Sequence, residues 1–205
     1  MNRYFIVFIF VLFLSISAIA AEDSSNWKKV SISGNEFRIP PEYDGGSLSD
    51  GKYQINNWNT FAILCVDNYL ANNYGYVYSS CSYSENLTIE GHPAYYFCGY
   101  NSYENTNLSR IYFACGESIY CISYKGNNLS SNINEIVATS QASSISSSDF
   151  YDILDEALDE YNYQQELDEN TYYQQQSYSS NDHYNKGSSF VRDYFFFKMG
   201  QYSSR

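Results

Sequence analysis

The chain has 205 residues, and its 23 acidic against 11 basic side chains give it a formal net charge of −12 at pH 7. Such a balance opposes nucleic-acid binding and adsorption to anionic lipid, because both need clustered cations to neutralise phosphate. The length accommodates one ordinary domain and a tail.

The first twenty residues read as a secretory signal peptide. Arg3 is followed by the apolar stretch 4–14 and then by the small-residue sequence Ala18-Ile19-Ala20. This order is typical of a signal peptide, and cleavage is expected before Ala21. The alternative is an uncleaved anchor, because residues 4–20 have about the minimum length of a membrane span. We therefore expect an exported protein, secreted or associated with the cell surface, with no membrane span after cleavage.

Residues 21–142 form the predicted folded domain, because apolar and polar residues alternate there in short runs broken by Gly, Asn and Ser. The expected strands are a hairpin in KKVSISGNEFRIP turning at Gly34-Asn35, a buried strand in TFAILCVD, a pair in LTIEGHPAYYFCGYN turning at Gly91-His92-Pro93, and a hairpin in SRIYFACGESIYCISYKG.

Two helices are expected in the same domain. DNYLANNYGYVY fits a short helix or a loop, and SNINEIVATSQ places Ile133, Ile136 and Val137 on one helical face, with Ser130 or Ser131 as N-cap. The predicted fold class is therefore α+β, an antiparallel sheet of about six or seven strands with flanking helices.

The character of the chain changes after residue 142. A serine-rich linker, 143–148, leads into an acidic amphipathic helix predicted over 149–161. Its apolar stripe at helical spacing consists of Phe150, Ile153, Leu154, Ala157, Leu158 and Tyr161, and we expect this stripe to dock on the sheet domain or on a partner. Residues 162–189 are a low-complexity Tyr/Gln/Ser/Asn tail, expected to be disordered. Residues 190–205 end the chain with a short apolar segment that is too short to span a bilayer.

The strand and turn pattern of residues 27–140 resembles that of small secreted archaeal proteins of uncharacterised function and, more distantly, PsbP/Mog1-like domains. The motifs that carry the resemblance are Trp27, Phe37-Arg38-Ile39-Pro40, Gly91-His92-Pro93-Ala94 and Ile119-Tyr120-Cys121-Ile122. The resemblance implies an antiparallel sheet flanked by helices, in a domain that binds or assembles rather than catalyses. It implies no functional residue, and it does not extend to residues 143–205.

Five cysteines lie in the predicted sheet domain: Cys65, Cys81, Cys98, Cys115 and Cys121. All are disulfide candidates, because paired cysteines are the default in exported proteins. The odd number leaves one thiol free or joined to another chain, which allows a covalent dimer. A pairing of Cys98 with Cys115 between neighbouring strands is one option.

Cys115 and Cys121 flank the turn of the last hairpin, and two registers are open. A turn through Glu117–Ile119 places the two cysteines directly opposite each other, with Cβ atoms about 4.5–5.5 Å apart, so that a disulfide would be strained. A two-residue turn at Gly116-Glu117 instead places Cys115 opposite Ser118, and the cysteines are not bonded.

The cysteine pattern disfavours three reactive sites. A thioredoxin-type centre needs C-x-x-C at a helix N-terminus, and structural zinc needs close cysteine knuckles, neither of which is present. A cysteine nucleophile with His92 as base, as in an envelope hydrolase, is the remaining alternative. Common nucleotide, metal and serine-hydrolase motifs are also absent, so we expect no cofactor, no metal and no catalytic residue.

Two further groups of residues are candidate sites. The N-glycosylation sequons are at Asn86, Asn107 and Asn128. The candidate aromatic binding face for a sugar or peptide consists of Tyr96, Tyr100, Tyr112, Tyr120 and Tyr124. The alternative is that helices cover both faces of the sheet.

Taken together, these features favour an exported, non-catalytic cell-envelope or surface protein that acts by binding or assembly. Its expected partner is an envelope polymer or another protein.

Overall fold

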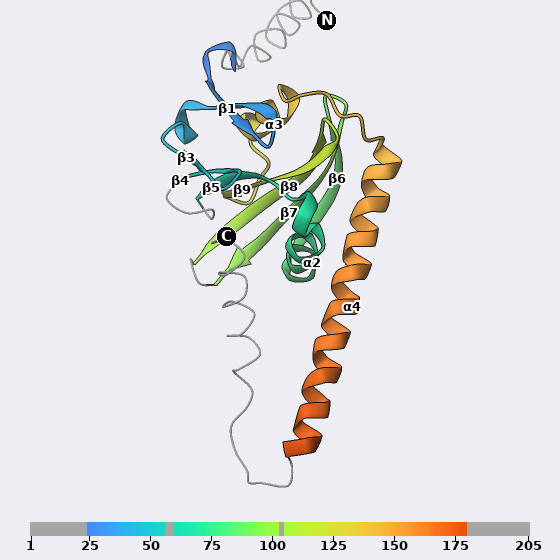
Figure 1. Ribbon diagram of the computed structural model, residues 1–205. Helices are drawn as coiled ribbons and strands as arrows, with labels where there is room; N and C mark the ends of the chain where they lie inside the picture. The colour runs from blue at the N-terminus through green and yellow to red at the C-terminus, as the bar shows by residue number, and fades with distance from the viewer. Residues whose placement is uncertain (1–23, 56–59, 103–104, 180–205) are drawn as a thin grey trace, which may run out of the picture.

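The computed structural model describes residues 24–55, 60–102 and 105–179, and the side chains as far as residue 171 (Figure 1). The strands are β1 (Lys28–Ile32), β2 (Asn35–Ile39), β3 (Ser47–Ser49), β4 (Lys52–Ile55), β5 (Phe61–Cys65), β6 (Tyr83–Ile89), β7 (His92–Asn101), β8 (Thr106–Cys115) and β9 (Ser118–Lys125). The helices are α2 (Leu70–Ser80), α3 (Ser131–Ala138) and α4 (Ser147–Ser179), with single 3-10 turns at Ser24–Asn26, Pro41–Tyr43 and Asp67–Tyr69.

The fold is α+β, as the sequence predicted. Seven strands form one antiparallel sheet in the order β3-β4-β5-β9-β8-β7-β6, and β1 pairs with β2 in a separate hairpin. The hairpin and α3 pack on one face of the sheet, while α2 and the first half of α4 pack on the other (Figure 1). Because the sheet is covered on both faces, its central strands β8 and β9 are buried almost throughout.

Four hairpins, β1–β2, β3–β4, β6–β7 and β8–β9, turn at two-residue loops, and two of these turns lie one residue earlier than predicted. The first hairpin turns at Ser33-Gly34, with φ of 48° and 89°, and the β6–β7 turn is Glu90-Gly91, with φ of 46° and 89°. Left-handed φ at both central positions matches the twist of the flanking strands. As a consequence, His92 and the proline after it belong to β7 rather than to the turn.

The predicted helices are present. Helix α3 begins after its N-cap Ser130, whose hydroxyl accepts a hydrogen bond from the backbone N–H of Ile133 at 3.2 Å. DNYLANNYGYVY forms a 3-10 turn and then α2. Strands β3 and β4 were not predicted, since their short polar sequence carries little periodicity. No helix in the described part of the chain is long and apolar enough to cross a membrane.

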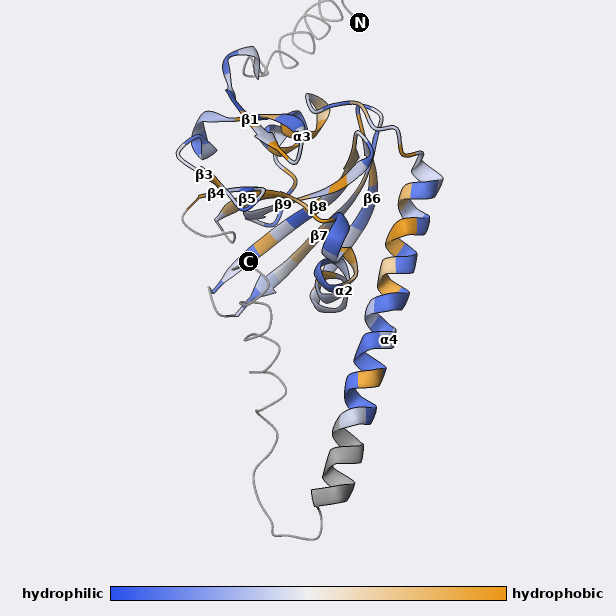
Figure 2. Cartoon of the chain, in the orientation of Figure 1, coloured by the Kyte–Doolittle hydropathy of each residue, from blue (hydrophilic) through white to orange (hydrophobic). Residues whose placement is uncertain are grey.

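Helix α4 docks through the predicted apolar stripe, of which Phe150, Leu154 and Ala157 are buried. Figure 2 shows that its apolar residues gather in the first half, next to α2. Packing there is close: a Cβ atom at Gly75 of α2 would overlap the ring of Tyr161. This contact explains why a glycine stands in the middle of a helix.

The helix does not stop at residue 161, so the prediction of disorder is wrong for residues 162–179, which continue α4. No Gly or Pro interrupts this stretch, and Glu and Gln favour helix, so nothing local ends the helix that the docked stripe begins. The rest of the predicted tail, residues 180–189, and the C-terminal segment 190–205 lie outside the described residues, as does the predicted signal peptide.

Candidate functional site

No two of the five cysteines are paired with each other, so all five are free thiols. The β8–β9 hairpin has the two-residue turn at Gly116-Glu117, so Cys115 lies opposite Ser118 and Cys121 lies opposite Tyr112 in the strand register. Cys115 packs with the β1–β2 hairpin and α3, whereas Cys121 packs with α2 and α4 on the opposite face of the sheet. A disulfide between them is therefore excluded by this register.

Burial makes the two innermost thiols poor nucleophiles. Burial raises the pKa of Cys121 to about 11, against smaller lowering effects of Arg110 and a hydrogen bond with Tyr112. Burial also raises the pKa of Cys115, and hydrogen bonds from Ser140 and the Gln141 backbone only partly oppose it. A nucleophilic cysteine needs a lowered pKa and access to substrate, and these two have neither.

His92 occupies a structural position. Its side chain is buried at the start of β7, and Nδ1 lies 2.9 Å from the carbonyl oxygen of Ala114. Its ring also lies edge-on to Phe113. In the described ranges, no group of three or more His, Cys, Asp or Glu side chains is placed to hold a metal ion.

The five tyrosines of the predicted aromatic face do not share an exposed surface. Tyr112 is buried under α2, and Tyr120 and Tyr124 are buried under the hairpin and α3 on the other face. The prediction of one open face is corrected in favour of its alternative, in which both faces are covered. Tyr100 is 60% exposed at the end of β7, and Tyr96 forms part of a groove.

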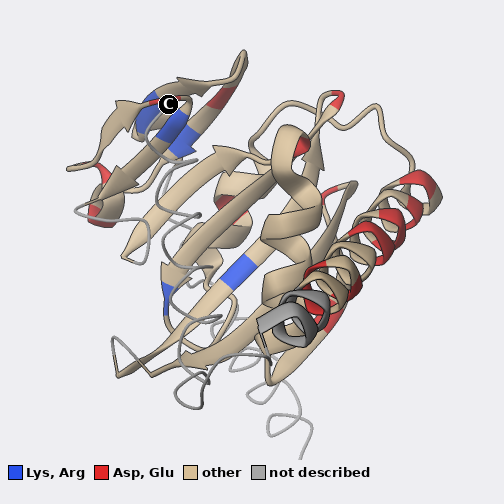
Figure 3. Ribbon diagram, turned by 60° about the horizontal axis from the view of Figure 1, so that its bottom comes forward, with Lys and Arg blue, Asp and Glu red and all other residues tan. Residues whose placement is uncertain are grey.

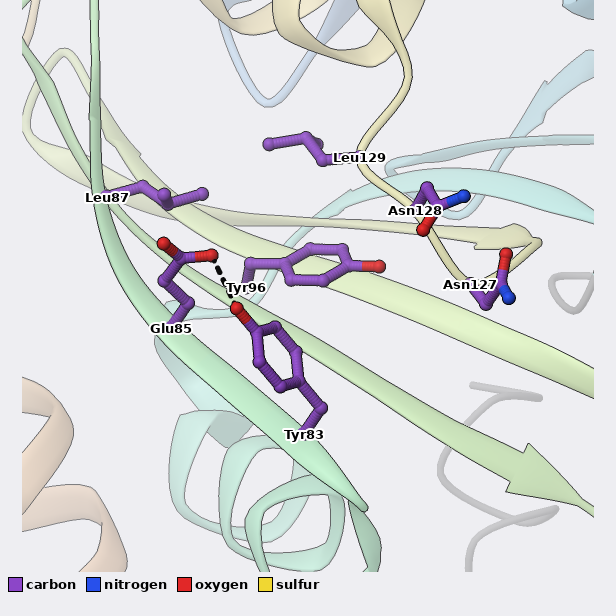
Figure 4. A pocket seen from close by; sticks show the side chains of 7 residues that line it. All are labelled: Tyr83, Glu85, Leu87, Tyr96, Asn127, Asn128 and Leu129. Atoms are coloured by element: carbon purple, nitrogen blue, oxygen red, sulfur yellow. Dashed lines mark hydrogen bonds between the residues drawn. The ribbon is translucent and has the colours of Figure 1, made fainter.

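This groove lies beside the edge strand β6. Its volume is about 380 Å³, and it is lined by Tyr83, Glu85, Leu87, Tyr96, Asn127, Asn128 and Leu129. β6 and β7 supply the first four, and the connection from β9 to α3 supplies the other three (Figure 4). Because side chains alternate along β6, its residues 83, 85 and 87 point to the same face of the sheet.

Tyr96 forms the floor of the groove, and Tyr83 forms a wall. The two rings meet edge to face, with centroids 6.2 Å apart. Tyr96 is 4% exposed, whereas Tyr83 is 53% exposed. The groove therefore combines aromatic surface with the amides of Asn127 and Asn128 (Figure 4).

A buried hydrogen-bond network behind the groove holds its asparagine wall in place. The hydroxyls of Tyr96 and Ser109 lie 2.7 Å apart, and Ser109 donates to the carbonyl of Gly126 at 3.0 Å. Tyr124 donates to the carbonyl of Asn128 at 3.1 Å. Two carbonyls of the β9–α3 connection are thus tied to the sheet, which preorganises the groove.

The carboxylate of Glu85 is the one charged group of the lining. It accepts a hydrogen bond from the Tyr83 hydroxyl at 2.8 Å. This hydrogen bond is the largest of the effects that raise the pKa of Tyr83. The groove therefore presents aromatic rings, amides and one hydrogen-bond acceptor of negative charge.

The three sequons differ in accessibility. Asn86 and Thr88 are both exposed on β6, and Asn128 is exposed at the groove. Asn107 is half-buried on β8, and the hydroxyl of its sequon serine, Ser109, belongs to the buried network.

Sequence reasoning found Tyr96 but missed the rest of the groove as a binding surface. It started the strand at Leu87, so Tyr83 and Glu85 were not placed on it, and Asn128 was considered only as a sequon. Nothing local in the sequence indicates that the β9–α3 connection folds back over β6, because that contact depends on the tertiary network.

Comparisons of the chain with protein-family models, curated proteins and solved structures gave no match. The resemblance of residues 27–140 to secreted archaeal proteins and PsbP/Mog1-like domains therefore stays a prediction.

Proposed function

We propose that the protein is an exported, non-catalytic binding protein of the cell envelope or surface, and that the groove beside β6 binds a neutral saccharide unit of an envelope polymer. The observation that carries this proposal is the lining itself, two tyrosine rings opposite two asparagine amides.

The chemistry of this lining suits a sugar. A pyranose ring has an apolar face that packs on an aromatic ring and hydroxyls that need amide or carboxylate partners. The groove volume of about 380 Å³ lies within the range of small-molecule sites. The Glu85 carboxylate accepts hydroxyl hydrogen bonds but repels an anionic sugar, so the proposal is restricted to neutral units.

The export part of the proposal is supported by the sequence of the first twenty residues and by the acidic composition. The non-catalytic part is supported by the burial of the Cys115 and Cys121 thiols and by the hydrogen bond of His92 to the Ala114 carbonyl.

The test is calorimetric titration of the purified protein with neutral oligosaccharides and with solubilised envelope polymer. Tyr83→Ala and Asn127→Ala should each weaken binding about fivefold, which corresponds to about 1 kcal/mol for one lost stacking or polar contact. Tyr163→Ala is the matched control, because Tyr163 is similarly exposed, at 59%, but lies on α4. Unchanged affinity of both groove variants for every ligand would overturn the proposal, as would a preference for acidic sugars.

A further inference from the structure

Strand β6 is a long free edge of the sheet. The sheet ends in β3 on one side and β6 on the other. β3 has three residues, whereas β6 has seven, and every β6 side chain is exposed or half-buried. No strand of the described chain pairs with the outer side of β6.

The register identifies the backbone groups that point outward. Pro93 has no N–H, so its pair with Thr88 does not exchange ladder hydrogen bonds. Hydrogen-bonded and non-hydrogen-bonded pairs alternate along an antiparallel ladder. Ser84, Asn86 and Thr88 therefore direct their N–H and C=O groups away from β7, toward the free edge.

This edge lacks the usual protection against pairing. Natural edge strands are shortened, bulged, or given Lys and Pro. β6 has the sequence YSENLTI and pairs with β7 in an unbroken register of seven residues. Glu85 is its only charge.

The surroundings of β6 are acidic. The hydroxyl of Tyr151 on α4 donates to the carbonyls of Leu87 in β6 and Ala94 in β7, both at 3.2 Å, which places the first turns of α4 over the face of these two strands. Asp152 and Asp155 are exposed on these turns, and Asp155 lies one turn beyond Tyr151 on the same side. Figure 3 shows acidic residues spread along the part of α4 whose side chains are described. β6, β7 and α4 contain no Lys or Arg.

We propose that the outer edge of β6 binds an extended, basic segment of a partner protein, which adds to the sheet as an eighth strand. Backbone hydrogen bonds to Ser84, Asn86 and Thr88 supply affinity that is independent of side chains, as in other strand additions. Side chains that alternate onto the α4 face meet the carboxylates of that helix, so Lys or Arg at every second position is favoured.

Charge also argues against a second copy of this chain as the occupant. Symmetric pairing of two β6 strands would bring two α4 helices to the same side of one sheet. Each helix carries acidic residues and no cation: Asp149, Asp152, Asp155, Glu156, Asp159, Glu160, Glu166, Asp168 and Glu169. Repulsion between them opposes this dimer.

The test uses the exported protein made without N-glycosylation, and two fluorescent peptides, TKVKVKT and TEVEVET. Anisotropy should show binding of the lysine peptide and none of the glutamate peptide. Asn86→Pro removes an outward N–H without breaking a ladder bond, and should weaken binding about tenfold or more. Asn86→Ala is the matched control, because it also removes the side chain and the sequon but keeps the N–H; its binding should be unchanged.

Two readouts separate strand addition from charge attraction alone. Hydrogen exchange at the amides of residues 84, 86 and 88 should slow when the lysine peptide binds. Asp152→Asn/Asp155→Asn should weaken binding about threefold and reduce its salt dependence. Equal binding to Asn86→Pro and Asn86→Ala, or tight binding of the glutamate peptide, would overturn the proposal. A dimer of the free protein that Asn86→Pro dissociates would also overturn it, since the occupant is then a second copy. Saccharide binding by the groove is tested separately, with the variants Tyr83→Ala and Asn127→Ala, so failure of one proposal can be distinguished from failure of the other.

Discussion

The imidazole of His92 donates the hydrogen bond that the backbone of Pro93 cannot. The β7–β8 register pairs Ala94 with Phe113, so Pro93 stands opposite Ala114 one step further along. Pro93 has no N–H to offer this carbonyl, and Nδ1 of His92 lies 2.9 Å from it. The Gly-His-Pro sequence is thus explained as the start of a strand, in which the histidine side chain supplies the hydrogen-bond donor that the proline backbone lacks.

This arrangement predicts that His92 contributes to stability. His92→Ala leaves the buried carbonyl of Ala114 without its donor and should lower the free energy of unfolding by about 1–3 kcal/mol, measured by urea denaturation. Pro93→Ala restores a backbone N–H at this position. The cost of His92→Ala should therefore be smaller in the Pro93→Ala background. If His92→Ala instead left stability unchanged and abolished a hydrolytic activity, the imidazole would be catalytic.

The buried thiol of Cys121 predicts a loss of stability at alkaline pH. Its pKa is about 11 in the folded protein against 9.0 in a free thiol, chiefly because of burial. Above pH 9 the unfolded chain loses this proton first, so stability is fully present below pH 9 and falls as pH rises toward 11, by up to about 2–3 kcal/mol. Denaturation between pH 8 and about 9.5, below the ordinary tyrosine pKa, measures how steeply the free energy of unfolding falls with pH. Cys121→Ala should flatten this dependence, and Cys81→Ala, a change of a half-exposed thiol, should change it less.

Local patterns were enough to predict the sheet, its approximate strand number and the docked stripe of α4. Alternation identifies strands because side chains have a period of two. Gly116 suits the first position of a two-residue turn, so the observed register was one of the two that the sequence left open. The exact turn positions were harder to predict, because Ser33 and Glu90 adopt a left-handed φ that is uncommon for serine and glutamate.

The groove was beyond local reasoning for a different reason. Tyr96, Ser109 and Tyr124 form its supporting network, yet each reads in sequence as one more polar residue of an alternating strand. Their common role depends on long-range register, and the tyrosine-rich composition hides it, since buried and exposed tyrosines follow the same pattern.

Close packing between α2 and α4 predicts that Gly75 tolerates no side chain. Gly75→Ala would place a methyl group into the Tyr161 ring, and overpacking should cost about 1–3 kcal/mol despite the better helix propensity of alanine. The double variant Gly75→Ala/Tyr161→Ala should recover part of this loss, because the clashing ring is removed. Thermal or urea denaturation of the unaltered protein, Gly75→Ala, Tyr161→Ala and the double variant measures the coupling energy between the two positions. Additive losses of stability from the two single changes would contradict the contact.

The differing exposure of the sequons predicts which of them carries a glycan in an N-glycosylating host. Asn86 should be modified, because its side chain and Thr88 both face solvent on the edge strand. Asn107 should stay unmodified in the folded protein recovered from such a host, since Ser109 is fully buried and hydrogen-bonded. Glycopeptide mass spectrometry measures the occupancy at each site, with Asn86→Gln as control. A glycan on Asn128 would occupy the groove and should abolish saccharide binding until it is enzymatically removed, whereas full occupancy at Asn107 would contradict the buried network.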